Sequence, residues 1–300
     1  MPLNLDRTLG VAVRSICLQT MADWELILHD DGSTDGSAEI AAAIADPRVR
    51  VVARPGRRGR PACLNEAIDL AQGRYLAVMD ADDIAYPERL ERQLAAFENQ
   101  PELDLVGSPA LVFDEGGAPL GKRAVPQSHR EICRRPWSGF GLWQPTFFGR
   151  IEWFRRHRYD VRRRRAQDFD LLLRSYATSR FANADEILLG YREGTISVRK
   201  SWRSRYHIVA SLTRGFTRRR RPDLALRGTI GQVLKGTVDG FAVASGLGYR
   251  VLRHRARPLS DAEKARWREV WTQVAGTGEG GSATAQARHA SGETSGAAGS

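Results

Sequence analysis

Apolar residues along the first hundred positions fall into short runs whose spacing changes repeatedly between that of a helix and that of a strand. The first helical stripe covers residues 9–16, and residues 24–28 then predict a strand. The elements predicted after them are a helix over 37–45, a strand over 50–53, a helix over 64–71, a strand over 75–79 and a helix opened by Pro87. Because strands and helices alternate, we expect a parallel sheet covered by helices.

The alternation ends near Pro101, and the later pattern is less regular. The elements predicted there are strands over 104–113, 143–148 and 187–191 and a helix over 167–176. Residues 202–271 are basic and helical in pattern, whereas residues 276–300 hold almost no large apolar side chain, which predicts disorder. We therefore divide the chain into an α/β domain over 1–200, a basic helical region over 201–273 and a disordered low-complexity tail over 274–300.

The charge of the chain is less ordinary than its apolar content. A length of 300 residues with 42% hydrophobic positions is enough for a real core, but the formal net charge is +11. Arginines cluster in the second half, at 155–165, 218–221 and 253–257. Such clusters suit phosphorylated substrates, anionic lipid or nucleic acid, and a merely solvated basic surface is an equal alternative.

Cysteine usage and the apolar runs indicate the compartment. Cys17, Cys63 and Cys133 are too widely spaced for a disulfide framework or a zinc site, and two of them fall in apolar helical patterns. We therefore expect these cysteines to be buried free thiols in a protein of a reducing compartment. The first ten residues lack the apolar core of a signal peptide, and no run of 18 apolar residues occurs. We expect a cytoplasmic protein, with an interfacial helix over 233–251 left open.

Two clusters of carboxylates follow predicted strands. Asp30 and Asp31 open the first, and Asp80, Asp82 and Asp83 form the second. In open α/β sheets, ligands bind just beyond the carboxyl ends of the strands. Carboxylate oxygens in that place suit Mg²⁺ or Mn²⁺, which can bridge to phosphates. The two clusters predict one site for a metal-bound, phosphate-bearing ligand.

The first cluster has two other interpretations. Asp, Gly and Ser are turn formers, so residues 31–35 also suit a turn or a helix cap. A calcium-binding loop beginning at Asp31 would need a glutamate at position 42, where Ala42 stands. The calcium loop is therefore excluded, and the turn is disfavoured by the presence of the second acidic cluster.

Several motifs, in this order, resemble those of the family 2 inverting glycosyltransferases of the GT-A fold. They are WELILHDDGSTDGS at 24–37, LNEA at 64–67, GRY at 73–75, MDADD at 79–83, PERL at 87–90 and QDFDL at 167–171. The likeness covers residues 4–199. It implies an α/β fold of the GT-A type, Rossmann-like, with a mixed, mostly parallel sheet, helices on both faces and an added helical C-terminal region.

The resemblance also implies how a nucleotide-sugar donor binds. Asp30 or Asp31 would hold the base and ribose, Asp80 would lie near the ribose, and Asp82 would bind the Mn²⁺ or Mg²⁺ that bridges the diphosphate. Arg60 belongs to an arginine-rich loop, 54–61, that could close over the nucleotide, although a solvated position is equally expected for any one arginine there. The residues expected to bind the nucleotide sugar are Asp30, Asp31, Asp80, Asp82, Arg60 and Asn65.

Asp168 resembles the family's catalytic base. Inverting transfer is a single displacement, so a carboxylate must take the proton of the acceptor hydroxyl. Gln167 stands where many relatives have an acid, which leaves Asp168 as the better base and Asp170 as the fallback. A purely structural role, as an acid favoured by the helix dipole, is the alternative. The segment 144–146 resembles an acceptor-side strand, often with His where Gln144 stands.

The family begins with an apolar strand that ends in Pro and, shortly afterwards, Asn. Residues 1–4 match only the tail of that strand. Since the strand belongs inside the sheet, its neighbours would otherwise carry unpaired backbone groups. We hypothesise that Met1 is an internal methionine. A stop codon directly upstream of Met1, with no apolar run before it, would contradict this.

These observations predict a metal-dependent inverting glycosyltransferase. It would move a sugar from a nucleotide-diphosphate sugar, foremost a UDP-sugar, to a hydroxyl of a glycan or lipid-linked acceptor in cell-surface polysaccharide synthesis. An anionic membrane surface at the inner face of the cell membrane is a further expected partner, and nucleic acid is not. The alternatives are a degenerate or truncated relative that binds nucleotide without transfer, a nucleotidyltransferase, and a basic nucleic-acid-binding protein.

Overall fold

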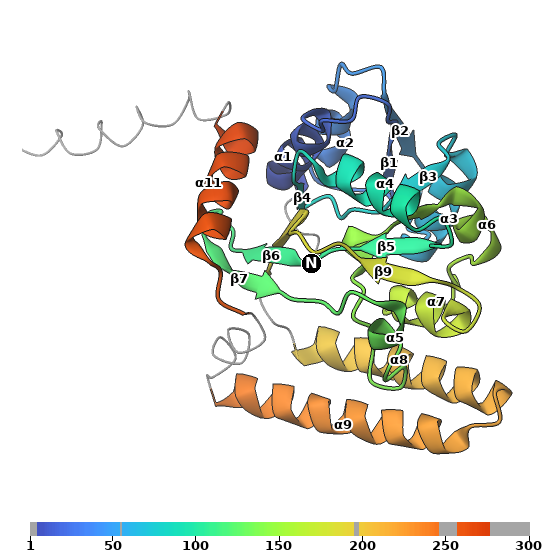
Figure 1. Ribbon diagram of the computed structural model, residues 1–300. Helices are drawn as coiled ribbons and strands as arrows, with labels where there is room; N and C mark the ends of the chain where they lie inside the picture. Colours follow the sequence, from blue (N-terminus) through green and yellow to red (C-terminus); the bar gives the residue numbers. More distant parts are fainter. Residues whose placement is uncertain (1–4, 55, 195–197, 246–256, 277–300) are drawn as a thin grey trace, which may run out of the picture.

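A computed structural model describes residues 5–54, 56–194, 198–245 and 257–276. Figure 1 shows strands in the centre of the molecule, helices on both sides of them, and a long pair of helices along one edge. The predicted α/β architecture with a mixed sheet and a helical C-terminal region is confirmed.

The predicted alternation of the first hundred residues is present. Its elements are α1 (Leu5–Cys17), β1 (Leu26–Asp30), α2 (Ser37–Ala42), β2 (Val49–Ala53), α3 (Arg60–Leu70), β3 (Tyr75–Ala77), β4 (Ile84–Ala85) and α4 (Arg89–Asn99). β1 and β2 pair in parallel, with Leu26 opposite Val49. Helix α3 begins before the predicted apolar stripe because Pro61 suits a first helical turn, where its missing N–H has no partner to lose.

The single strand predicted over 104–113 is wrong, because two strands occupy this stretch. They are β5 (Leu105–Gly107) and β6 (Ala110–Phe113), and they belong to different sheets. Pro109 stands between them, and proline cannot donate to a ladder of hydrogen bonds, so the pairing is interrupted there. The chain therefore passes from one sheet to the other at this point.

The strand predicted over 143–148 is also largely wrong. Residues Gln144–Thr146 form a short 3₁₀ helix, and the strand β8 is Phe148–Arg150. Pro145 fixes the backbone and removes a donor, and the Thr146 hydroxyl donates to the Trp143 carbonyl at 2.7 Å. Local bonds thus replace the pairing that the apolar pattern predicted.

The strands form one pair and two four-stranded sheets. The strands not yet introduced are β7 (Pro119–Arg123), β9 (Phe181–Asn183) and β10 (Leu189–Arg192). The sheet orders are β1-β2, β3-β8-β5-β9 and β4-β10-β6-β7. Pairs β1–β2, β5–β9 and β6–β10 are parallel, and the others are antiparallel.

The largest core lies between β5, β8 and the helices that follow. These helices are α5 (His129–Ile132), α6 (Ile151–Arg156) and α7 (Gln167–Ser175). Leu105, Phe147, Phe154 and Leu171 are fully buried in this core. The predicted helix over 167–176 is therefore confirmed, with its apolar face against the sheet.

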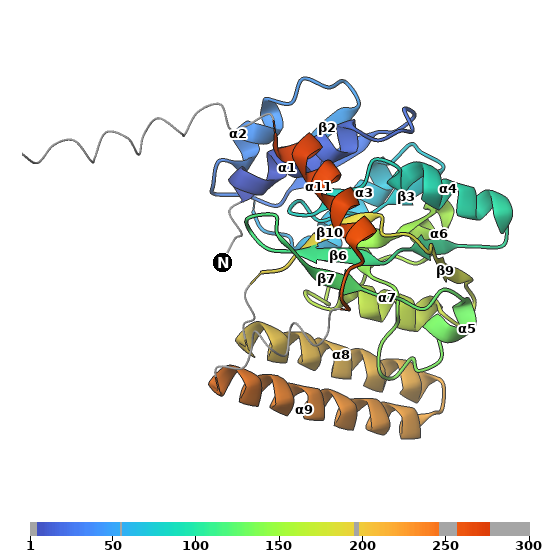
Figure 2. The same ribbon diagram turned by 60° about the vertical axis from the view of Figure 1, so that its left-hand side comes forward.

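Within the described residues, three helices form the C-terminal part. α8 (Val198–Arg218) and α9 (Pro222–Ala244) run antiparallel, and α8 packs on α7, whereas α11 (Asp261–Ala275) lies at the other end of the molecule against β6 (Figure 2). The residues beyond Gly276, where disorder was predicted, lie outside the described part of the chain. Within the described segments, no helix combines the length and the apolarity needed to cross a membrane.

Trp267 fastens α11 to the sheet. Its side chain is fully buried against Phe113, and its indole Nε1 donates to the Gly117 carbonyl at 2.8 Å. A Cβ on Gly190 of β10 would lie 2.4 Å from the Trp267 ring, so only glycine permits this contact.

We therefore expect Gly190→Ala to lower the free energy of unfolding by about 1–3 kcal/mol, because the new methyl group would force the indole out of place. Gly231→Ala is the matched control, since a Cβ there meets nothing within 4 Å. In the middle of α9 it should raise stability by about 0.5–1 kcal/mol through helix propensity. Urea unfolding of both variants checks the pair, and equal effects would contradict this account.

Candidate active site

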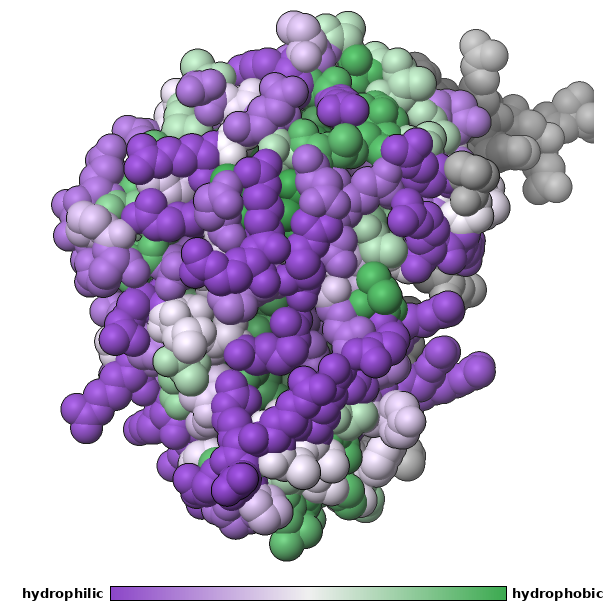
Figure 3. Space-filling view, turned by 90° about the vertical axis from the view of Figure 1, so that its right-hand side faces the viewer, coloured by the Kyte–Doolittle hydropathy of each residue, from purple (hydrophilic) through white to green (hydrophobic). Residues whose placement is uncertain are grey.

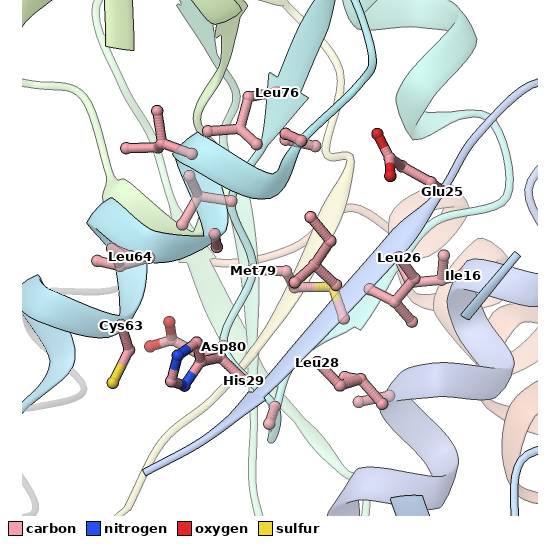
Figure 4. A pocket seen from close by; sticks show the side chains of 18 of the residues that line it. Ile16, Glu25, Leu26, Leu28, His29, Cys63, Leu64, Leu76, Met79 and Asp80 are labelled. Carbon is pink, nitrogen blue, oxygen red and sulfur yellow. The ribbon is translucent and has the colours of Figure 1, made fainter. Parts of the chain in front are cut away.

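A cavity of about 1880 Å³ lies between β1 and β3. Its middle is apolar: Figure 4 shows Ile16 of α1, Leu26 and Leu28 of β1, and Leu76 of β3 around it. His29 and Asp80 lie together at one end in the same view. That end is the carboxyl edge of the strands, where a ligand site was predicted.

The backbone edges that face this cavity are unpaired within the described part of the chain. β1 pairs with β2 and β3 pairs with β8, and neither has a second neighbour there. The expected apolar strand before Met1 would need such a place between two strands. Its existence stays a prediction, which the codons upstream of Met1 will test.

The first acidic loop is held by backbone donors. The Asp30 carboxylate accepts from the Ser33 amide at 2.8 Å, and the Asp31 carboxylate accepts from the amides of Arg58 and Gly59 at 2.7 and 2.9 Å. Asp31 thus ties the first loop to the arginine-rich loop. Both aspartates line the cavity.

The arginine-rich loop is fixed through Glu66 of α3. The Glu66 carboxylate accepts from Arg54 Nε and Arg58 Nη1, both at 2.7 Å, and lies 3.0 Å from His29 Nε2. Hydrogen bonds with His29 and Arg54 lower the pKa of Glu66 to about 2. Arg54 and Arg58, two of the four arginines in the loop 54–61, are therefore bound to the Glu66 carboxylate and hold the loop against α3.

The second acidic cluster forms a candidate metal centre. One oxygen from each of Asp80, Asp82 and Asp83 lies within 4.8 Å of the others. Burial and then the neighbouring Asp80 raise the pKa of Asp82, and the same causes, with Asp82 added, raise the pKa of Asp83 well above its usual value. Asp83 Oδ2 is buried and has no hydrogen-bond partner among the described residues. These carboxylates fit a divalent cation of the Mg²⁺ or Mn²⁺ type.

Two arginines partly balance this negative charge. Arg60 makes a two-pronged ion pair with Asp80, with Nη1 at 3.1 Å from Oδ2. Burial lowers the pKa of Arg60, but the charge of Asp80 outweighs it and the net shift is upward. Arg192 donates from its backbone amide to Asp83 Oδ1 at 3.0 Å and from Nε to the Asp82 carbonyl at 3.0 Å.

Asp168 and Asp170 have different surroundings at the start of α7. Asp170 is buried and accepts from Arg174 Nε at 2.7 Å and from the Ser211 hydroxyl at 2.8 Å, so it joins α7 to α8. Asp168 is half-buried, and burial raises its pKa, which the charge of Arg60 partly offsets. Ala166, which precedes the helix, has a left-handed backbone (φ 51°). Such strain in a non-glycine residue is typical of functional sites.

Asn65 and Asp168 do not line the cavity, unlike Asp30, Asp31, Asp80, Asp82 and Arg60. The Asn65 amide binds the backbone of Tyr159 at both ends, accepting from its N–H at 3.0 Å and donating to its carbonyl at 2.9 Å. The direct contact of Asn65 with a nucleotide stays a prediction. The pKa of Asp168 is lowered by the charge of Arg60 and raised by that of Asp80.

Sequence reasoning missed Tyr159 and the role of Arg89. The Tyr159 hydroxyl accepts from Gln144 Nε2 at 3.0 Å, and Gln144 Oε1 accepts from Gln167 Nε2 at 2.8 Å. This chain of polar contacts joins the acceptor-side segment to the residue next to Asp168. No periodicity signals Tyr159, because its contacts are distant in sequence.

Arg89 is fully buried beneath the acidic cluster. Its Nη2 donates to the carbonyls of Val78 and Pro145, both at 2.9 Å. Burial lowers its pKa to about 10, and the charge of Asp83 partly opposes that shift. The PERL motif contains Arg89, but only the structure shows that it joins the end of β3 to the acceptor-side segment.

Comparison with known proteins shows what this chain is similar to. The model of glycosyl transferase family 2 matches residues 4–158. Putative glycosyltransferase EpsE of Bacillus subtilis is 36% identical over 197 residues, which are 63% of this chain and 70% of that protein. Succinoglycan biosynthesis protein ExoO of Rhizobium meliloti is 32% identical over 209 residues, 65% of this chain and 60% of that one.

Among solved structures, Staphylococcus aureus TarS 1–349 in complex with UDP-GlcNAc superposes with a TM-score of 0.56 at 16% identity. The match covers 90% of this chain and 78% of that one. Likeness at such low identity concerns the fold, and it confirms the predicted GT-A type.

We expect Mn²⁺ to raise the melting temperature. At a Mn²⁺ concentration one hundred times Kd, the free energy of unfolding should increase by about 2.7 kcal/mol. Asp82→Asn should abolish this gain, and it should stabilise the metal-free protein, because it removes one of three crowded carboxylates. Glu152→Gln, at an exposed carboxylate on α6, is the control and should keep the full metal response. A thermal-shift titration measures both effects, and an undiminished response in Asp82→Asn would exclude the site.

Proposed function

This chain belongs to glycosyl transferase family 2, and from that membership we propose that it transfers a sugar, with inversion, from a nucleotide-diphosphate sugar to a hydroxyl group. We propose a UDP-sugar as donor and a glycan or lipid-linked molecule as acceptor. The observation that carries the proposal is the convergence of Asp30, Asp31, Asp80, Asp82 and Arg60 on one end of one cavity. These residues come from separate loops, so their meeting requires the whole fold.

The donor would lie across the carboxyl ends of β1 and β3. Asp30 and Asp31 would bind the nucleoside, whose hydroxyl and N–H groups are donors for carboxylates. Arg60 would be shared between Asp80 and the diphosphate, because a guanidinium binds phosphate oxygens in a two-pronged manner. TarS, with which this chain shares its fold, was solved with UDP-GlcNAc, which supports a UDP-sugar among the possible donors.

Asp82, with Asp80 and Asp83, would hold a Mn²⁺ or Mg²⁺ ion. When bound, such an ion supplies positive charge that stabilises the leaving diphosphate. The three acids would then also keep the diphosphate at a fixed distance from α7. Burial, and after it the repulsion between neighbouring carboxylates, raises the pKa of Asp82 and Asp83, and a bound cation would favour their charged forms.

Asp168 would act as the general base. As the acceptor oxygen forms its bond to the anomeric carbon, the bond from that carbon to the diphosphate oxygen breaks and Asp168 takes the hydroxyl proton. A raised pKa makes a carboxylate a stronger base, and Asp168 has that shift. Asp170 is held by Arg174 and Ser211, which leaves it a structural role.

We propose that the acceptor belongs to a cell-surface polysaccharide and that the enzyme works at the inner face of the cell membrane. The relationship to ExoO, a succinoglycan biosynthesis protein, supports the polysaccharide. The formal charge of +11 and the basic helix α8 support attraction to anionic lipid.

The proposal predicts the response to nucleotides. UDP with Mn²⁺ should raise the melting temperature, whereas UDP alone should have little effect, because a cation held by Asp80, Asp82 and Asp83 would supply the positive charge that the diphosphate needs beside these acids. GDP, CMP and dTDP form the comparison panel. A shift with one of these instead of UDP would reassign the donor. No shift with any of them, from a folded sample, would reject the nucleotide-sugar site.

Asp168→Asn should reduce kcat for transfer by about 10²–10⁴-fold and leave nucleotide binding unchanged, because the base acts only on the acceptor. Asp170→Asn is the matched control. It should lower the free energy of unfolding by about 1–3 kcal/mol, through loss of buried partners for Arg174 and Ser211, while transfer by the folded fraction continues. Transfer that survives in Asp168→Asn would remove the assigned base. Binding without transfer in the wild type would favour a degenerate relative.

The acid side of the pH profile tests the same residue. A general base works only when deprotonated, so kcat/KM should fall as the pH drops through the raised pKa of Asp168, above the value of about 3.9 for a free aspartate. Asp168→Glu should move this limb, and Asp170→Asn should not. Measurements at saturating Mn²⁺ keep the metal site filled, and a limb unaffected by Asp168→Glu would assign the titration to another group.

A further inference from the structure

Helix α9 has its apolar residues on the side that faces away from the protein. Leu226 and Phe241 expose 63% and 73% of their surface, and four further apolar residues at helical spacing are exposed with them. We call these six residues the outer face: Leu226, Ile230, Val233, Leu234, Val238 and Phe241. A surface helix of a soluble protein normally has the opposite arrangement, with its apolar stripe on the core.

The inner side of α9 is small and polar. A Cβ on Gly228 would lie 2.7 Å from Leu212, and a Cβ on Gly236 would lie 2.8 Å from Trp202, so glycines let α9 approach α8 closely. Buried Asp239 pairs with Arg205 of α8, and Arg205 Nη1 also donates to Gln232 at 3.0 Å. Small residues and polar bonds between helices, with large apolar residues outside, are the packing typical of helices in contact with lipid.

The surroundings of the outer face are aromatic and basic. Trp202 and Tyr206 of α8 are exposed, and an amphipathic ring of this kind is favoured at a membrane interface. Arginines 218–221 lie at the junction of α8 and α9, and Arg218 and Arg220 are exposed there. Figure 3 shows hydrophobic side chains next to strongly hydrophilic ones at the lower end of the molecule, where α8 and α9 lie.

We propose that the outer face of α9 docks onto an anionic lipid bilayer, with its apolar side chains at the boundary between headgroups and acyl chains. Helices of this kind lie in the interface plane, and their binding combines buried apolar area with attraction to anionic lipid. The basic turn at 218–221 would supply the attraction. A second copy of the chain is the other occupant that this face could take, and the experiment distinguishes it from lipid.

This inference deepens the membrane-associated part of the proposed function, but it stands on the geometry of α8 and α9 alone. A failure of the proposed transfer reaction would leave it intact. The readout is therefore lipid binding, with transfer to a water-soluble acceptor measured separately on the same samples.

The experiment is co-sedimentation of the full chain with vesicles of phosphatidylglycerol and phosphatidylcholine, and with phosphatidylcholine alone. A triple variant, Ile230→Ser with Leu234→Ser and Phe241→Ser, removes half of the outer face. Leu18→Ser with Val161→Ser is the matched control, since both residues are exposed and lie outside the C-terminal helices. We expect the triple variant to lose about tenfold or more in vesicle partitioning, because several partly inserted side chains are lost.

The control variant should bind as the wild type does. Arg218→Glu with Arg220→Glu should weaken binding to the anionic vesicles and reduce its dependence on salt. Undiminished binding of the triple variant, or no binding of the wild type at low salt, would overturn the proposal. A wild-type dimer that the triple variant converts to a monomer, without any vesicle binding, would assign the outer face to a second copy.

Discussion

The site depends on three carboxylates that stand within 4.8 Å of one another where the β3 segment ends. Like charges at that distance repel, and partial burial makes the repulsion stronger than in water. The protein holds them with cations on several sides: Arg60 binds Asp80, Arg192 binds the Asp83 carboxylate and the Asp82 carbonyl, and Arg89 lies buried beneath. Burial and the neighbouring carboxylates still raise the pKa of Asp82 and Asp83, so these cations offset the repulsion only in part.

One of these arginines also connects the end of β3 to the segment 144–146. Arg89 joins the carbonyl of Val78 to that of Pro145, and Gln144 continues the contact to Tyr159 and Gln167. The residue that precedes Asp168 is therefore linked to the loop that carries the acidic cluster. A displacement of either side would disturb a buried, fully bonded network, which is costly. The network thus couples the start of α7 to the end of β3.

The two C-terminal helices α9 and α11 differ in where their large apolar residues lie. α11 buries Trp267 against the sheet in the ordinary way, while α9 turns small and polar residues inward and large apolar residues outward. Both helices carry equal numbers of acidic and basic residues, and neither has the length and apolarity needed to cross a membrane. The large apolar residues of α11 are buried in the core, whereas those of α9 are exposed.

The sequence by itself determined the elements with strong periodicity and the chemistry at their ends. The alternation up to residue 100, the two acidic loops and the helix that carries Asp168 all depend on local spacing, which a helix or strand expresses directly. Tertiary structure alone decided the rest. The interruption at Pro109 divides one predicted strand between two sheets. The contacts of Asp170 with Arg174 and Ser211 give it surroundings different from those of Asp168. The packing of α9 on α8 determines which face of α9 is exposed. In each case the deciding contact joins residues or elements whose meeting the local pattern does not encode.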